Sequence, residues 1–197
     1  MRVRAALIVA LAALAACANP APTRYYTLLA ESAPPAAASG KPPDYRVAIG
    51  PVSLPEALDR RQIVLRVAPN RYAIADTDRW AEPLKREIPR VIAEDVARQL
   101  LQAGIAADSQ LGGQGVDYRV LIDVLRFESV PGESIALEAA WSVRDRAGRR
   151  LHEANFRLVE KVKDPGVAAL VSAHAKALAA LAADIATAVR TLARSKK

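Results

Sequence analysis

Few side chains in this sequence have the types and spacings that catalytic chemistry needs. The chain has one cysteine, Cys17, and two histidines, His152 and His174. The histidines lie in unrelated segments without the H-E-x-x-H spacing of a metal site, and no G-x-S-x-G elbow marks a nucleophilic serine. Two scattered histidines are more often surface or satisfied core residues than ligands. We therefore predict no catalytic residues, no metal, no cofactor and no enzymatic activity.

Cys17 differs from the histidines because its neighbours predict a covalent modification. A basic start is followed by an apolar run over residues 5–16, which is too short to span a bilayer as a stable helix. The run ends in Leu14-Ala15-Ala16-Cys17, which resembles a bacterial lipobox. In that pathway the thiol receives a diacylglycerol, the preceding peptide is removed and the new amine is acylated. We predict a signal peptide over residues 1–16 and lipidation of Cys17; an ordinary signal peptide with an incidental cysteine is the alternative.

The residues after Cys17 predict where the protein is held. Residues 17–23 form a lipidated tether that reaches only about 20 Å when extended. Several acyl chains anchor a protein stably, because each buried methylene contributes about 0.8 kcal/mol and one chain alone is marginal. Ala18 follows the cysteine, whereas Asp there resembles an inner-membrane retention signal. We therefore predict an outer-membrane lipoprotein on the periplasmic face, with no internal disulfide for want of a second cysteine.

Composition and charge narrow the remaining classes of protein. The chain has 197 residues, of which 52% are hydrophobic, so one domain with a sizeable core is expected and wholesale disorder is excluded. The formal net charge is +7. The predicted compartment rules out nucleic acid as a partner. The charges are scattered, which favours a solvated basic surface over a site for anionic lipid or an acidic protein.

The first half of the mature chain is predicted to form strands and one helix. Residues 24–31 and 45–50 read as strands, the second ending at Gly50-Pro51, and residues 32–44 as a flexible Pro- and Ala-rich connection. Residues 62–67 and 71–75 predict a hairpin. A helix over about 82–103 carries a buried stripe, is either kinked or interrupted at Pro89, and stops at Gly104.

The second half is predicted to form an antiparallel meander and a last helix. Strands are predicted over 118–125, 135–143 and 152–162. Both faces of the first are partly apolar, as expected of a central strand, and the meander is polar on one side. A helix over 167–193 follows, with Asp164 as its cap and Pro165 as its first residue. The predicted fold is α+β: a single domain over residues 24–194, with a mostly antiparallel sheet, two long helices packed on it and a basic tail over 195–197.

One motif is specific enough to indicate a family. The chain reads I-G-P-V-S-L-P-E-x-L-D-R-x-Q-I-V-x-R over residues 49–66 and R-W-A-E-P-L over residues 79–84. Both segments resemble the signature of the ABC-type transport auxiliary lipoproteins, the PqiC (YmbA) family. Ala57, Arg61 and Leu65 depart from the family pattern, in which aromatic, Pro and Thr residues are usual. The departures concern details of one loop and leave the resemblance intact.

The resemblance implies a function and a set of partners. The protein would be a non-enzymatic component of an intermembrane lipid-transport system that docks or stabilises a periplasmic MCE-domain protein, and a homo-oligomeric ring is plausible. The implied partner-binding residues are Leu54, Pro55, Asp59, Arg60, Gln62 and Trp80. A lipid-binding periplasmic module and a pilotin-like assembly lipoprotein of a secretion complex are the alternatives.

Two local roles can be predicted within this signature. Trp80 stands just before the expected helix start and reads as an apolar staple against Leu84, with an aromatic anchor at a protein interface as the second interpretation. The charged residues around it are predicted to orient the loop through ion pairs: Asp59 with Arg60 and Arg61, and Glu82 with Arg79 and Lys85.

Replacement of the cysteine tests the lipid anchor. Cys17→Ala removes the only thiol, so the chain should take up no labelled palmitate and should remain unprocessed or soluble in the periplasm. The measurement is palmitate labelling followed by membrane fractionation. Labelled palmitate that still enters the Cys17→Ala protein would refute the lipobox.

Overall fold

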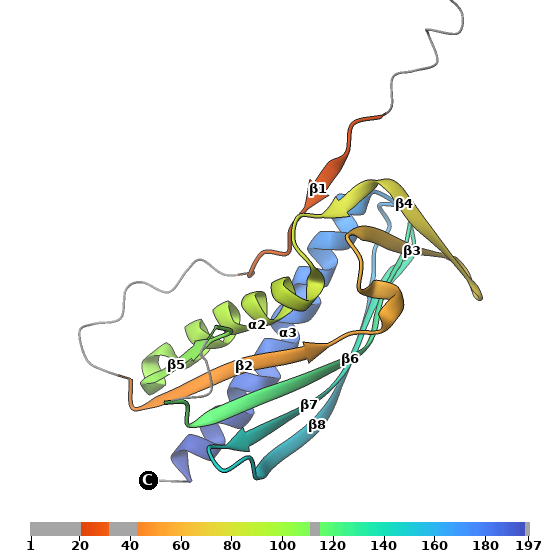
Figure 1. Cartoon of the computed structure of the whole chain (residues 1–197). Coiled ribbons are helices and arrows are strands. Elements are labelled where there is room, and N and C mark those ends of the chain that lie inside the picture. The colour runs from red at the N-terminus through yellow and green to blue at the C-terminus, as the bar shows by residue number, and fades with distance from the viewer. Residues whose placement is uncertain (1–20, 32–42, 111–114, 196–197) are drawn as a thin grey trace, which may run out of the picture.

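The computed structural model describes residues 21–31, 43–110 and 115–195 (Figure 1). The predicted signal peptide, Cys17 and most of the tether lie outside these residues. In the described part, eight strands form two sheets, and two long helices, α2 (Leu84–Leu100) and α3 (Val167–Arg194), pack against the larger sheet. The predicted α+β class is confirmed, and the described residues form a single domain with one hydrophobic core.

The larger sheet has five strands in the order β5-β2-β6-β7-β8. Their bounds are β2 (Tyr45–Ser53), β5 (Ile105–Asp108), β6 (Tyr118–Val130), β7 (Ser134–Asp145) and β8 (Arg150–Lys161). The strands β6, β7 and β8 form the predicted antiparallel meander, and β6 is central. The strand β2 is parallel to both of its neighbours, so the sheet is mixed.

The smaller sheet contains three strands in the order β1-β4-β3, with β1 (Arg24–Tyr26), β3 (Gln62–Ala68) and β4 (Arg71–Trp80). The predicted hairpin of β3 and β4 is confirmed, and its tip projects to the side of the five-stranded sheet near the far end of β6 (Figure 1). The strand β1 runs parallel to β4, where the Arg24 guanidinium donates to both Asp78 oxygens at 2.8 and 2.9 Å.

Both helices cover the same face of the five-stranded sheet (Figure 1). Alternate residues of β6 and β7 are buried on that face, while the residues between them stay partly exposed. The apolar stripes of α2 and α3 complete the core, and the alanines of α3 allow close approach. By length and composition α3 could also cross a membrane, but 56% of its most apolar window is buried within the protein, as in a core helix.

The first strand is shorter than predicted because its second half binds a helix instead. β1 ends at Tyr26 rather than at residue 31. The Glu87 carboxylate, 1% exposed, accepts hydrogen bonds from Thr27 Oγ1 at 2.7 Å and from Leu28 N at 3.3 Å. Arg90 Nη2 donates to Leu28 O at 2.9 Å. The backbone groups that a longer strand would pair are thus partly satisfied by α2, and burial raises the pKa of Glu87.

Several predicted boundaries are wrong. β4 ends at Trp80 rather than at residue 75, and β6 ends at Val130 rather than at residue 125. Three further boundaries differ for local reasons. β2 continues through Gly50-Pro51 to Ser53, because the register with β6 shifts between Ile49 and Val52 and Pro51 sits exposed in that irregularity. α2 begins at Leu84 and runs through Pro89 as one helix. The cap of α3 is Gly166; the Asp164 carboxylate instead accepts a hydrogen bond from Gly166 N at 2.8 Å.

One strand is missing from the sequence-based prediction. β5 follows Gly104, which adopts a left-handed φ of 70° and ends the helical segment as predicted. Among the four residues Ile105–Asp108 only Ile105 is β-branched, and the segment is too short to show an alternating pattern, so nothing marks it as a strand. β5 pairs with β2 because the left-handed turn at Gly104 places residues 105–108 beside it.

Candidate functional site

The signature loop, residues 54–61, joins β2 to β3 at the end of the sheet near the hairpin. It contains a short 3₁₀ turn, Glu56–Leu58, that begins after Pro55. Leu58 N donates to Pro55 O at 2.9 Å, Asp59 N to Glu56 O at 3.1 Å and Arg60 N to Leu58 O at 2.8 Å. Successive backbone bonds therefore fix the loop conformation internally.

The signature loop is also tied to the start of α2 and the end of β4. Lys85 Nζ lies 2.6 Å from Asp59 Oδ2, and Trp80 N donates to Arg61 O at 2.7 Å. The prediction that ion pairs orient the loop named the wrong partners. Asp59 pairs with Lys85, and Glu82 pairs with Arg86 one helical turn later at 3.3 Å.

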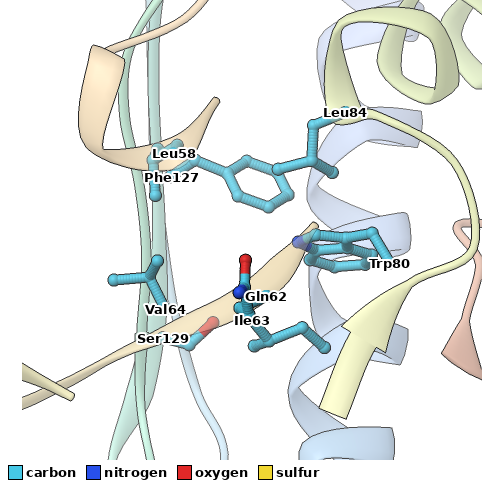
Figure 2. Close-up of a pocket in the computed structure, with 8 residues that line it drawn as sticks. All are labelled: Leu58, Gln62, Ile63, Val64, Trp80, Leu84, Phe127 and Ser129. Atoms are coloured by element: carbon cyan, nitrogen blue, oxygen red, sulfur yellow. The ribbon is translucent and has the colours of Figure 1, made fainter. Parts of the chain in front are cut away.

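A small, mostly apolar pocket lies beneath the loop (Figure 2). It has room for about one water molecule. Trp80 borders it from β4, with its ring edge-on to Phe127 at a centroid distance of 6.4 Å. Residues from the loop, both sheets and α2 line the pocket: Leu58, Gln62, Ile63, Val64, Trp80, Leu84, Phe127 and Ser129.

The six implied partner-binding residues divide into a supporting set and an exposed pair. Trp80 is 4% exposed, and Leu54, Pro55 and Gln62 are half-buried. Gln62 and Trp80 meet at the pocket, while Leu54 packs against the core. Asp59 and Arg60 face solvent, and within the described residues Arg60 makes no side-chain hydrogen bond or ion pair. The burial of Trp80 accords with the staple interpretation.

A serine and a histidine lie side by side under the pocket, although no motif predicts a joint role for them. Ser129 Oγ is 2.9 Å from His174 Nε2, and the His174 ring stacks on Phe127 at 3.8 Å. His174 is fully buried, which lowers its pKa to about 3. Such an imidazole stays neutral and is a weak base, so the pair lacks the activation of a catalytic serine. The helical spacing of position 174 from Leu170 and Leu178 is the signal that places His174 in the core.

The described residues contain no group of three or more His, Cys, Asp or Glu side chains that could hold a metal ion. This region is a surface loop held in place above an aromatic layer, which consists of the packed rings of Trp80, Phe127 and His174.

Comparison with known proteins identifies the family. The ABC-type transport auxiliary lipoprotein component family matches residues 26–186, so the chain belongs to that family, as the signature predicts. Membership indicates a membrane-anchored lipoprotein on the periplasmic side that is an auxiliary component of a transport system. No curated protein matches the sequence.

Solved structures show the same fold. The crystal structure of an uncharacterized protein superimposes with a TM-score of 0.71 at 20% identity and covers 85% of this chain and 99% of its own. A DUF330 protein from Xanthomonas campestris gives a TM-score of 0.69 at 19% identity, with 89% and 100% covered. The PelC dodecamer from Paraburkholderia phytofirmans gives 0.41 at 13% identity, with 76% and 91% covered, a likeness too distant to carry an argument.

Replacement of Trp80 tests whether the aromatic layer supports the fold. Trp80→Ala removes a large buried side chain, which costs about 3–5 kcal/mol of the free energy of unfolding. The protein should melt markedly lower whether or not a partner is present, as measured by circular dichroism. An unchanged melting curve with lost partner binding would instead make Trp80 an interface anchor.

The buried histidine predicts a specific pH dependence. His174 binds a proton near pH 6.5 in the unfolded chain but only near pH 3 in the folded protein. Between these values the unfolded state holds more protons, so the free energy of unfolding falls as the pH falls, by about 1.4 kcal/mol per pH unit well below pH 6.5.

Urea unfolding of the wild type and of His174→Gln at several pH values isolates this contribution, because other titrating groups cancel in the difference. The wild type should lose stability relative to His174→Gln between pH 6 and pH 4. A difference that does not vary with pH would show that His174 titrates alike in both states.

Proposed function

We propose that this protein is an outer-membrane lipoprotein that docks or stabilises the periplasmic MCE-domain partner of an intermembrane lipid-transport system through its signature loop. The observation that carries the proposal is the form of that loop. It is braced from below by Trp80 and from the side by Lys85, yet it presents Asp59 and Arg60 to solvent. A loop held in one conformation binds a partner without a further ordering cost.

The predicted anchor supports the location. Lipidation of Cys17, with Ala18 beside it, would hold the domain on the periplasmic face of the outer membrane. The described chain begins next to β1, which lies at the same end of the molecule as the hairpin (Figure 1). A short tether attached there keeps this end within reach of the membrane. The signature resemblance supports the MCE partner and the homo-oligomeric ring.

The alternative functions remain predictions. The pocket beneath the loop holds about one water molecule, whereas small-molecule sites enclose about 300–1,000 Å³. An acyl chain therefore has no room there, and a lipid-binding module would need another surface. A pilotin-like role would be favoured by a secretin gene beside this one, and the proposed role by a neighbouring MCE gene.

Replacement of Arg60 tests the docking surface. Because its side chain is solvated and makes no hydrogen bond or ion pair within the described residues, Arg60→Ala should leave the melting temperature unchanged. It should weaken binding of the MCE-domain protein by about 2 kcal/mol or more if Arg60 contributes as an interface hot spot. Melting curves and binding isotherms with the purified partner provide both readouts.

Arg71→Ala at the tip of the hairpin is the matched control, since it removes the same exposed charge elsewhere. Equal loss of affinity in both variants would reveal general electrostatic attraction. Full affinity in Arg60→Ala would move the interface away from the signature loop.

A further inference from the structure

Three arginines lie in a row across the face of the five-stranded sheet opposite the helices, at the end where β6 begins. Arg119 of β6 lies opposite Arg144 of β7, and Arg144 lies opposite Arg150 of β8. Tyr118 and Val143 beside them are buried under the helices. Both helices lie on one face of this sheet (Figure 1). Because successive side chains of a strand alternate, Arg119 and Arg144 lie on the opposite face from Tyr118 and Val143, which the helices bury. We call this set the arginine row.

Three acidic side chains close to the row in sequence are already paired with an arginine, and none of them pairs with Arg119 or Arg144. Glu153 pairs with Arg150. Asp145 Oδ2 lies 3.1 Å from the guanidinium of Arg149, and its other oxygen accepts backbone bonds of the turn. Asp117 Oδ1 lies 3.0 Å from Arg146, and Asp117 Oδ2 accepts a hydrogen bond from the backbone N of residue 46 at 2.8 Å. Each of these three carboxylates thus already forms an ion pair with an arginine other than Arg119 or Arg144.

Arg119 and Arg144 are left facing each other without an acidic partner. The residue on the other side of Arg119 is Ala48, and Asp108 beyond it accepts a hydrogen bond from Gln110 N at 2.8 Å. Within the described residues, neither arginine makes a side-chain hydrogen bond or ion pair, and Arg144 Nε is shielded from water with no hydrogen-bond partner. All Asp and Glu side chains of the sequence lie in the described ranges, so no acidic side chain elsewhere can fill the gap.

Two like charges directly opposite each other destabilise a sheet, and a shielded guanidinium nitrogen without an acceptor adds to that cost. An anion between the two guanidinium groups would remove both penalties. The planar fork of arginine matches the oxygens of phosphate or carboxylate, and cross-strand neighbours lie about 5 Å apart at Cβ, close enough to hold one such group together.

The surface beside the pair is partly apolar. Leu121, half-buried, is the next residue of β6 on this face, and Leu125 further along is 55% exposed. Asp123 between them is hydrogen-bonded to Ser53 of β2. We propose that Arg119 and Arg144 bind the phosphate of an anionic phospholipid, whose chains lie along Leu121 and Leu125.

Calorimetric titration of the full-length protein in maltoside micelles tests the site. The probes are dihexanoylphosphatidylglycerol, dihexanoylphosphatidylcholine and inorganic phosphate. The anionic lipid should bind most tightly, and Arg119→Gln/Arg144→Gln should weaken it at least about tenfold, because charge-assisted hydrogen bonds are lost. Arg119→Lys/Arg144→Lys keeps the charge but not the fork, so it should restore the affinity only in part.

Arg71→Gln/Arg194→Gln is the matched control, since it lowers the net charge equally at two exposed positions outside the row. The control should bind the lipid like the wild type, and melting curves should show all variants folded. Unchanged binding by Arg119→Gln/Arg144→Gln, or an equal loss in the control, would overturn the site. Inorganic phosphate that binds as tightly as the lipid would overturn the phospholipid assignment.

Discussion

The fold depends on the apolar layer between the β6–β7 face of the sheet and the helices α2 and α3. Alternate residues of both strands are buried in this layer, and the other elements pack around it. The buried face of the two strands is continuous from Tyr118 to Phe127, and the apolar stripes of both helices close over it. A shift of either strand by one residue would carry every apolar side chain to the solvent. The register of the meander is therefore fixed. The position of each outward-facing residue along its strand, and its cross-strand neighbour, are fixed with it.

The same layer explains which parts of the fold could be predicted from the sequence. Periodicity marks α2, α3 and the meander, because their burial is one-sided and long enough to leave a pattern. β5 is too short and too rich in alanine to do so, and only the left-handed turn at Gly104 brings it to the edge of β2. Likewise, the strand rules place a break at Gly50-Pro51, but an irregular register lets β2 pass through.

The candidate site was predictable as a set of residues but not as a geometry. The motif names Asp59, Gln62 and Trp80, yet the sequence alone does not show that Asp59 pairs with Lys85 or that Trp80 packs against Phe127 from a distant strand. Both contacts depend on how the hairpin meets β6. The depressed pKa of His174 arises in the same way, from burial that only the assembled layer creates.

The rigid central strand also separates the two surfaces proposed to bind other molecules. Arg119 opens β6, whereas Phe127 and Ser129 lie near its far end under the signature loop. Eight residues of extended chain set Arg119 and Phe127 roughly 25 Å apart. At this distance, with no shared partner, substitutions at Arg60 and at the arginine row should have additive effects on stability. Two such surfaces would let a protein partner bind at one end of the molecule and an anionic phospholipid at the other, with the core between them unchanged.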